Sequence, residues 1–381
     1  GAWSATIVEG GDDFITLRST VEGSGSDNAQ QTGVKSIEGA GEHPIDFWID
    51  FKGTIAENST PRCAIVRVRY HNYTCEHDIY VRQGYAPITI DGNAESDKNP
   101  AWASYNVYCF DANNAPVYTK SPLEEGSLFR RGNRTAILAS NNDRPGFTFG
   151  LGPSGSFDVL ELGATTPSQK TWSQLAPSAD DVKSRFASWS IAGDHERIAT
   201  IEDFYTLEST SIHSNIGKAY GVLYGDGATE TQKSVEVALG YDHNEDPTNS
   251  KKGMRGCFVF NINNSHNIFF PIGKSGYGRR KGMTSNGEKV GTLRYAQRTD
   301  YYNNDGTGNI QYVPLFYDLF ERPGAIYQCR NRLESTNNEV KNSSAFDINY
   351  FTMGFEGFEN GASNNNNGSD SDACFIRTVK Y

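Results

Sequence analysis

Short runs of alternating apolar and polar residues, separated by loops rich in Gly, Asn and Asp, recur along this chain. In one of them, Ile45, Phe47, Ile49 and Phe51 alternate with Asp46, Trp48 and Asp50. This is the two-residue period of a half-buried β-strand. Hydrophobic residues make up only 36% of the sequence, while aromatic residues reach 12% and Gly reaches 39 residues. Such a composition suits many short strands around thin aromatic cores, so we predict a mainly β chain with some α.

The first 90 residues read as one β domain. Apolar and polar residues also alternate in Val66–Tyr70 and in Asp78–Gln83, and the residues His71-Asn72-Tyr73 between these runs predict a hairpin turn. Further strands are expected at Trp3–Val8, Phe14–Val21 and Gly33–Glu38. The number of strands predicts an Ig-like β-sandwich over residues 1–90. Residues 91–100 are polar and bounded by prolines, which is typical of a linker.

Residues 101–381 predict a second domain in which short aromatic strands alternate with long polar loops. The expected strands are Tyr105–Phe110, Phe147–Leu151, Phe157–Leu162, Val235–Leu239, Cys257–Asn261, Ile268–Ile272, Thr292–Gln297, Ile348–Met353 and Cys374–Val379. Two capping boxes predict helices, one beginning at Thr200 and one at Ser178. The low-complexity stretch Asn360–Asp372 predicts a loop.

Several motifs resemble those of Bacteroidales cell-surface lipoproteins and fimbrial adhesins. The run from His77 to Tyr85 resembles the "I-x-V-R-Q-G" ending of their Ig-like modules. Residues 372–381 resemble the final strand of the C-type-lectin-like fold, in its formylglycine-generating-enzyme or Fibrobacter-paralogous form. Four earlier segments of this chain resemble, in the same order, earlier sequence blocks of that fold: Arg197–Phe204, Gly256–Phe260, Phe270–Gly278 and Gly291–Tyr295. The resemblance implies an Ig-like β-sandwich followed by an enlarged C-type-lectin-like α+β domain with loop insertions at 101–381.

The net charge of −11 makes nucleic acid an improbable partner, because an acidic surface repels phosphate. No stretch approaches the roughly 18 apolar residues of a membrane span.

The start Gly1-Ala2-Trp3 reads as a processed or engineered end. We therefore expect a targeting segment upstream of it, and the family resemblance implies a lipid anchor there and a location on the outer membrane, facing the exterior.

Patterns for metals and cofactors are sparse. The six cysteines are widely spaced without a C-x-x-C pair, and we expect Cys374 to be buried near Cys257 or Cys109. His71, Cys75 and His77 have ligand-like spacing at the predicted hairpin turn, where ordinary surface side chains are the simpler interpretation. Gly150–Gly155 matches the G-x-G-x-x-G pattern of dinucleotide-binding sites, but the segments on both sides are predicted strands, so we expect a glycine turn. We predict no cofactor; if a metal binds, calcium is the candidate, and its oxygen ligands would come from Asp242, Asp246, Asp300 and Asp305.

Aromatic and basic residues gather between Arg279 and Tyr327, and loops on a rigid scaffold commonly carry binding sites. The candidate ligand-binding residues are Arg279, Arg280, Arg294, Tyr295, Tyr301, Tyr302, Tyr312 and Tyr327. No catalytic residue is predicted. With the family resemblance, this predicts a non-catalytic adhesion or recognition protein, as a fimbrial tip or accessory subunit that binds a glycan, a protein or other fimbrial subunits. A carbohydrate-active hydrolase is the alternative, since the 46 acidic residues would permit a pair of catalytic carboxyls.

Overall fold

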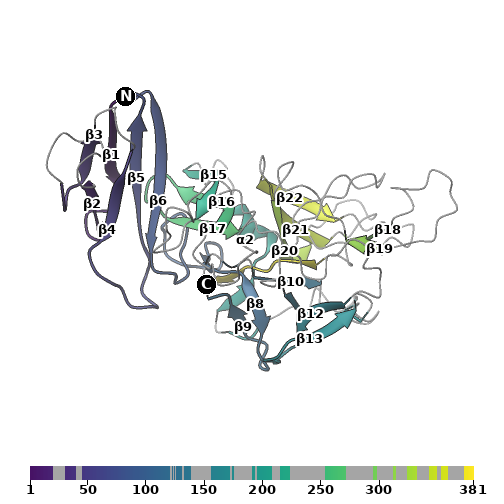
Figure 1. Cartoon of the computed structure of the whole chain (residues 1–381). Helices are drawn as coiled ribbons and strands as arrows, with labels where there is room; N and C mark the ends of the chain where they lie inside the picture. Colours follow the sequence, from purple (N-terminus) through teal and green to yellow (C-terminus); the bar gives the residue numbers. More distant parts are fainter. Residues whose placement is uncertain are drawn as a thin grey trace, which may run out of the picture. The chain divides into compact units, whose positions relative to one another are not determined.

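A computed structural model of the chain describes residues 1–19, 31–39, 45–120, 122, 124, 126–130, 133–138, 156–171, 174–175, 191–193, 195–207, 215–223, 254–271, 295–297, 312–314, 324–332, 343–349, 353–358 and 373–381. These residues form a mainly β structure (Figure 1). The chain divides into two compact units. The first contains Gly1–Glu95, Ser209–Gly217 and Val259–Ile268, and the second contains Ser96–Glu208, Lys218–Phe258 and Phe269–Tyr381.

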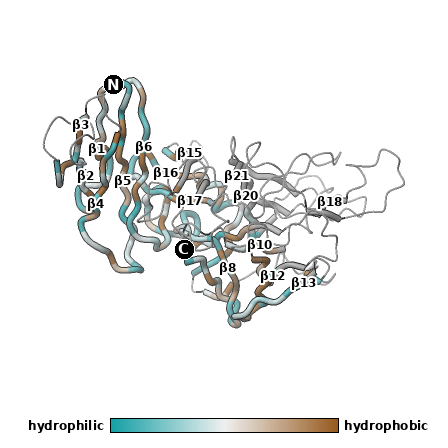
Figure 2. The backbone as a smooth tube through the Cα atoms, in the orientation of Figure 1, coloured by the Kyte–Doolittle hydropathy of each residue, from teal (hydrophilic) through white to brown (hydrophobic). Residues whose placement is uncertain are grey.

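The first unit is built on six strands in two antiparallel sheets. They are β1 (Trp3–Glu9), β2 (Ile15–Ser19), β3 (Ser36–Gly39), β4 (Phe47–Phe51), β5 (Arg62–Tyr70) and β6 (Cys75–Gln83). One sheet has the order β3-β1-β5-β6 and the other pairs β2 with β4. All strand positions expected before residue 90 are therefore confirmed, with shifted ends. Apolar and polar residues alternate along these strands in Figure 2.

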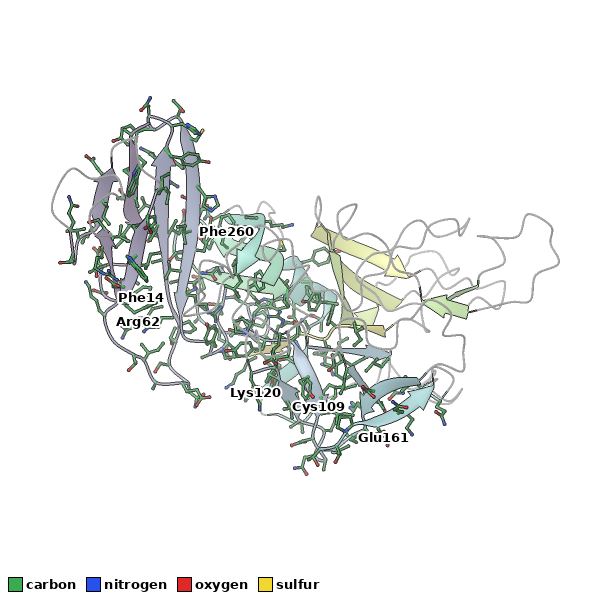
Figure 3. The ribbon with its side chains drawn as sticks, in the orientation of Figure 1. Phe14, Arg62, Cys109, Lys120, Glu161 and Phe260 are labelled. Carbon is green, nitrogen blue, oxygen red and sulfur yellow. The ribbon has the colours of Figure 1, made fainter. Side chains whose placement is uncertain are left out.

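A single apolar core joins the two sheets of the first unit. Its fully buried members include Trp3, Ala5, Leu17 and Val66. The Trp3 ring stacks on Phe47 with 6.2 Å between the ring centroids. Phe14 (labelled in Figure 3) also belongs to this core, and its ring centroid lies 6.2 Å from that of Phe51. Two sheets whose inner faces share a core define a β-sandwich.

The predicted hairpin is confirmed by the pairing of β5 with β6, whose register runs from Arg62 opposite Gln83 to Tyr70 opposite Cys75. Its turn places three consecutive non-glycine residues in the left-handed region: His71, Asn72 and Tyr73 have φ of 51°, 55° and 66°. Asn and His tolerate this conformation better than most residues.

Segments far along the sequence complete the first unit. The centroid of the Phe260 ring (labelled in Figure 3) lies 4.3 Å from the centroid of the Tyr80 ring. Arg82 donates hydrogen bonds to three carbonyl oxygens, those of Gly84 at 3.0 Å, Ala86 at 2.9 Å and Asn267 at 2.6 Å. Further along the chain, the side chains of Ile88 and Ile90 are buried. Hydrogen bonds from Arg82 thus fix the start of the segment that follows β6.

The second unit contains many short strands. They are β7 (Ala101–Trp102), β8 (Val107–Phe110), β9 (Pro116–Tyr118), β10 (Ser127–Arg130), β11 (Ala136–Leu138), β12 (Ser156–Leu160), β13 (Ser168–Thr171), β14 (Glu196–Ile198), β18 (Tyr295–Gln297), β19 (Tyr312–Pro314), β20 (Gly324–Arg332), β21 (Ser343–Asn349), β22 (Met353–Phe358), β23 (Ala373–Cys374) and β24 (Thr378–Lys380). Their sheet orders are β13-β12-β11-β10-β23, β14-β24-β7, β20-β21-β22, β8-β9 and β18-β19. A further sheet, in the order β15-β16-β17, consists of Ile216–Leu223, Met254–Asn261 and Asn267–Pro271; residues 216–217, 259–261 and 267–268 of these strands belong to the first unit and the rest to the second.

One short helix, α2 (Ile201–Tyr205), confirms the capping box predicted at Thr200. The Thr200 side chain accepts from the backbone N–H of Asp203, and the Asp203 carboxylate accepts from the backbone N–H of Thr200. The helix directs Phe204 into an aromatic core, 5.0 Å from Trp102 and 6.4 Å from Tyr327 between ring centroids. The capping box predicted at Ser178 lies outside the described residues, as do the strands expected at 147–151 and 235–239.

Two of the strands expected near the C-terminus are wrong in extent. The run 348–353 is not one strand: Ile348 pairs with Met353, so the sequence between them connects the antiparallel strands β21 and β22. The run 374–379 is divided into β23 and β24, because Phe375, Ile376 and Arg377 between them are fully buried and bond to several different segments. A simple alternation of apolar residues could not distinguish these arrangements from single strands.

Candidate functional site

The outer face of the β2–β4 sheet carries an exposed tryptophan fixed by an ion pair. The register places Trp48 opposite Arg18 and Asp50 opposite Thr16, so all four residues share one face of the two strands. Arg18 donates to both carboxylate oxygens of Asp50, from Nε at 2.8 Å and from Nη2 at 3.2 Å. Its guanidinium also lies over the Trp48 ring, 4.9 Å from the centroid. We refer to Arg18, Trp48 and Asp50 as the Trp48 platform.

The Trp48 side chain is unusually accessible for its size. It is 53% exposed, whereas Trp3 and Trp102 are 1% exposed. Arg18 lies over one face of the indole, and about half of the surface of Trp48 is still exposed. A large planar surface that is already fixed by a neighbour loses little conformational entropy when it binds a ligand.

The ion pair of the platform favours the charged form of Arg18. The hydrogen bond to Asp50 is the largest cause that raises the pKa of the Arg18 guanidinium; desolvation lowers it, and the charge of the Asp50 carboxylate raises it further. The side chains of Arg18 and Asp50 are 28% and 40% exposed, so solvent reaches both partners. The contribution of such a pair to folding is small, and its main effect is to orient the indole.

The sequence already contained a signal for Trp48. Within residues 45–51 the apolar phase of the alternation is Ile45, Phe47, Ile49 and Phe51, and of these Phe47 and Ile49 pack on the core. Trp48 falls in the polar phase with Asp46 and Asp50, so the two-residue period directs it to solvent. An aromatic residue on the polar face of a strand is a reason to look for a binding surface, yet Trp48 is absent from the candidates predicted from the sequence.

The candidate ligand-binding residues chosen from the sequence fall into three groups. Arg279, Arg280, Arg294, Tyr301 and Tyr302 lie outside the described residues. Tyr295 and Tyr312 lie on the paired strands β18 and β19, where Gln297 is opposite Tyr312. The two tyrosines therefore lie on neighbouring strands but at opposite ends of the three-residue ladder, since Tyr295 is opposite Pro314. The calcium candidates Asp242, Asp246, Asp300 and Asp305 also lie outside the described residues.

Tyr327, which forms the third group, is buried and is not part of the exposed surface that the sequence suggested. Its side chain is 0% exposed. The ring lies 5.1 Å from Phe270 and 5.7 Å from Phe375, and its hydroxyl accepts from Asn106 Nδ2 at 3.1 Å. A tyrosine whose ring is packed by aromatics and whose hydroxyl has a buried partner belongs to the core.

Beside Tyr327 lies a fully buried arginine. Arg377 donates from Nε to Asn106 Oδ1 at 2.8 Å, from Nη1 to Ala103 O at 2.9 Å and from Nη2 to Phe269 O at 3.0 Å. Its guanidinium lies 4.8 Å from the Phe270 centroid. Desolvation lowers the pKa of Arg377, and no described carboxylate forms an ion pair with it. This cation ties four segments together, so we assign it a structural role.

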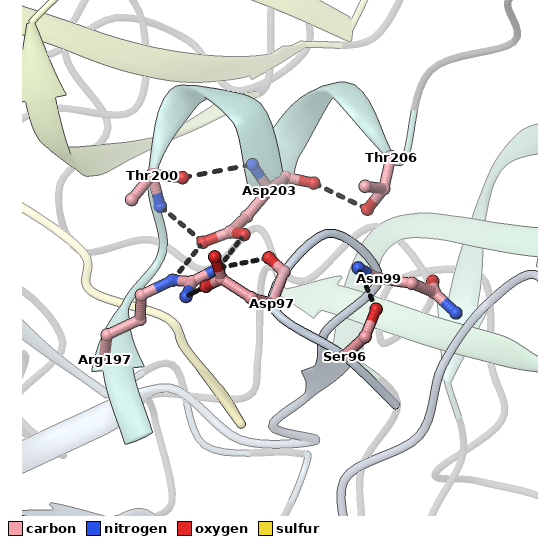
Figure 4. A network of polar contacts seen from close by, with 7 residues as sticks. All are labelled: Ser96, Asp97, Asn99, Arg197, Thr200, Asp203 and Thr206. Atoms are coloured by element: carbon pink, nitrogen blue, oxygen red, sulfur yellow. Dashed lines mark hydrogen bonds and ion pairs between the residues drawn. The ribbon is translucent and has the colours of Figure 1, made fainter. Parts of the chain in front are cut away.

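A second buried arginine fixes the start of helix α2 (Figure 4). Arg197 on β14 donates to Asp203 from Nη2 at 2.6 Å and from Nε at 3.1 Å, and also binds the Asp97 carboxylate. Burial alone would lower the pKa of Arg197, but the hydrogen bonds and charges of Asp203 and Asp97 outweigh it and raise that pKa. Asp203 simultaneously caps the helix through Thr200. Because both carboxylate oxygens of Asp203 accept bonds from Arg197 and Thr200, and Asp203 is itself buried, we assign this network a structural role as well.

No group of three or more His, Cys, Asp or Glu side chains in the described part of the chain is placed to hold a metal ion. Within the same residues, no helix is long and apolar enough to span a membrane. Cys63, Cys75, Cys109 and Cys257 are free thiols. The side chain of Cys374 is outside the description, while its backbone pairs with Phe129.

Comparison with known proteins adds no assignment: no family model, no curated protein and no solved structure matches this chain. The function is therefore inferred from the Trp48 platform and from the motifs of the sequence.

Proposed function

We propose that this chain is a non-catalytic recognition protein of a bacterial cell surface, which attaches to glycan or protein ligands through the Trp48 platform. The observation that carries the proposal is an indole that is 53% exposed and held by the Arg18–Asp50 pair. Exposed aromatic residues of this kind supply most of the affinity at recognition surfaces. The resemblance to Bacteroidales lipoproteins and fimbrial adhesins supports the surface location and a role as a fimbrial tip or accessory subunit.

Attachment to cells tests this proposal. We would incubate the fluorescently labelled full chain with epithelial cells and measure bound protein by flow cytometry. Trp48→Ala should weaken attachment by about 10-fold, which corresponds to about 1.4 kcal/mol. Tyr73→Ala is the matched control, because Tyr73 is 48% exposed on the hairpin turn of the same unit and should leave attachment unchanged. Equal attachment by wild type and Trp48→Ala would refute the assignment of the site.

A carbohydrate-active hydrolase is the second candidate, and one observation favours it. Burial raises the pKa of the Glu196 carboxyl, against lowering by Thr378 and Lys380, and a raised pKa is expected of a general acid. Tyr118 and Thr378 both bind Glu196 Oε1 through their hydroxyls. Release of reducing sugar by the wild type, abolished in Glu196→Gln, would establish the hydrolase and overturn the non-catalytic proposal. The recognition proposal predicts no turnover by either protein.

A further inference from the structure

We infer that β4 pairs antiparallel with β4 of a second copy of this chain, so that two β2–β4 sheets join into one four-stranded sheet. The inference does not depend on which ligand the Trp48 platform binds. It follows from three properties of β4: the direction of its backbone hydrogen-bonding groups, a residue pattern that is complementary to itself, and opposite charges at its two ends.

The first property is the direction of the backbone hydrogen bonds. On β2, Leu17 exchanges two bonds with Val34, at 2.8 and 3.2 Å, so its N–H and C=O groups point away from β4. Because this direction alternates along a strand, the groups of the residues on either side of Leu17 point toward β4. The register places those residues opposite Trp48 and Asp50, whose own N–H and C=O groups therefore point toward β2.

The remaining residues of β4, Phe47, Ile49 and Phe51, direct their N–H and C=O groups to the other side, along the outer edge of the sheet. The bond from the Lys52 N–H to the Phe14 carbonyl oxygen, at 2.7 Å, agrees with this alternation. In the part of the chain that the structure describes, no strand pairs with that edge. A row of unpaired backbone donors and acceptors is a template for a further strand.

The side chains of β4 do not protect this edge. Charged residues commonly protect an edge strand against pairing. The edge strand of the other sheet, β6, carries Glu76, Asp78 and Arg82, whereas β4 has a single charge, Asp50, among four apolar residues. Phe51 shares the core-facing phase of Phe47 and Ile49 but is 49% exposed, so a strand added beside β4 covers apolar surface.

The second property is that β4 is complementary to itself, as a two-fold contact between identical chains requires. When Ile49 is opposite Ile49 of the second copy, Phe47 is opposite Phe51 and Trp48 is opposite Asp50, so every residue of β4 has a partner. The unpaired groups of Phe47, Ile49 and Phe51 then bond to each other across the two-fold axis, and each Phe51 gains an aromatic cross-strand neighbour. The two Trp48 platforms lie on the same face of the joined sheet.

The third property is charge at the ends of β4. Asp46 and Lys52 are exposed and lie just beyond the two ends of the strand, each three residues from Ile49. The register centred on Ile49 therefore places Asp46 of each copy opposite Lys52 of the other. Lys52 Nζ donates to Asp12 O at 2.7 Å and retains two further N–H donors. These two opposite-charge contacts counteract the repulsion between chains that each carry a net charge of −11, which favours a second copy as the added strand.

Sedimentation velocity of the full chain, from low micromolar to several hundred micromolar, tests the inference. We expect the wild type to shift from a one-chain to a two-chain species as its concentration rises, because a strand of five residues makes a small interface. Asp46→Lys alone, or Lys52→Asp alone, places like charges opposite each other at both ends and should weaken association about 10-fold. An equimolar mixture of the two variants should restore association, because opposite charges then meet at both ends. The matched control is Glu38→Lys, which makes the same change in net charge as Asp46→Lys at an exposed position of β3 and should leave association unchanged.

Restored association in the mixture would support the register centred on Ile49 and would also show that both variants are folded. A wild type that remains a single chain at every concentration would overturn the inference, and a strand of a different protein would become the candidate for this edge. A two-chain species that neither variant weakens would place the contact elsewhere on the molecule. A mixture that associates no better than either variant alone would refute the pairing of Asp46 with Lys52, and with it the self-pairing of β4.

Discussion

Replacing Arg377 by lysine is expected to destabilise the second unit severely, although the charge is kept. The guanidinium is 0% exposed and its three nitrogens donate to three different acceptors, Asn106 Oδ1, Ala103 O and Phe269 O. An ammonium group at a single point cannot reach acceptors that surround a planar fork. Its burial is at least as costly, because ammonium is the more strongly hydrated ion.

The magnitude follows from the bonds that are lost. If lysine keeps one of the three acceptors, two hydrogen bonds to a charged donor disappear, at about 1.5 kcal/mol each or about 3 kcal/mol together. With an unfolding slope of about 3 kcal/mol per M of urea, the midpoint should fall by about 1 M. Urea unfolding followed by circular dichroism measures this shift directly.

The matched control is Arg62→Lys, since Arg62 (labelled in Figure 3) is exposed on β5 and forms no ion pair with another described residue. This control should change stability by less than about 0.5 kcal/mol. If the urea midpoint of Arg377→Lys matched that of Arg62→Lys, the acceptors around Arg377 would not depend on the guanidinium. The structural role assigned to Arg377 would then be wrong.

Three further predictions concern stability and reactivity. Asp203→Asn should cost about 3 kcal/mol in urea unfolding, because it leaves the buried Arg197 without its main partner; a change below about 1 kcal/mol would contradict the network. Glu196→Gln should raise the urea midpoint at pH 7 but not at pH 3, since a carboxyl whose pKa is raised on folding loses stability as pH rises above its unfolded pKa of about 4.3; an advantage at both pH values would contradict this sign. In maleimide labelling, Cys75 should react before Cys257, because Cys75 is partly exposed and burial raises the pKa of Cys257 to about 12; rapid labelling of Cys257 would show that its site opens.

Local patterns in the sequence were sufficient for much of the fold. The start of α2 depends on residues three positions apart, Thr200 and Asp203, and the hairpin of β5 and β6 pairs residues at most 21 positions apart, from Tyr70 opposite Cys75 to Arg62 opposite Gln83. Strand period and capping chemistry are encoded at that range, so they could be recognised directly. The mainly β character followed from the same short patterns.

Contacts between distant residues could not be predicted in this way. Tyr327 contacts Asn106 across 221 positions and Arg377 contacts Asn106 across 271. From sequence alone, a tyrosine in a polar region is equally suited to a surface and to a core, and only the tertiary structure shows that this one is buried. Arg377, within a strand-like run, gave no sign in the sequence that it would be fully buried and bonded to Asn106, Ala103 and Phe269.

The candidate site is an intermediate case. The position of Trp48 in the polar phase of its strand was visible in the sequence, and so was the nearby Asp50. The partnership with Arg18 depends on the pairing of β2 with β4 across 32 positions, which no local pattern fixes. The exposed aromatic could be identified from sequence, whereas its fixed orientation required the structure.

The most direct test of the recognition site is the NMR spectrum of the indole N–H groups. The chain has five tryptophans, and Trp48→Phe would identify the signal of Trp48. On addition of a ligand that the wild type binds, we predict a shift of the Trp48 signal, while those of the buried Trp3 and Trp102 stay in place. A Trp48 signal that does not move while the protein binds its ligand would contradict recognition through the Trp48 platform.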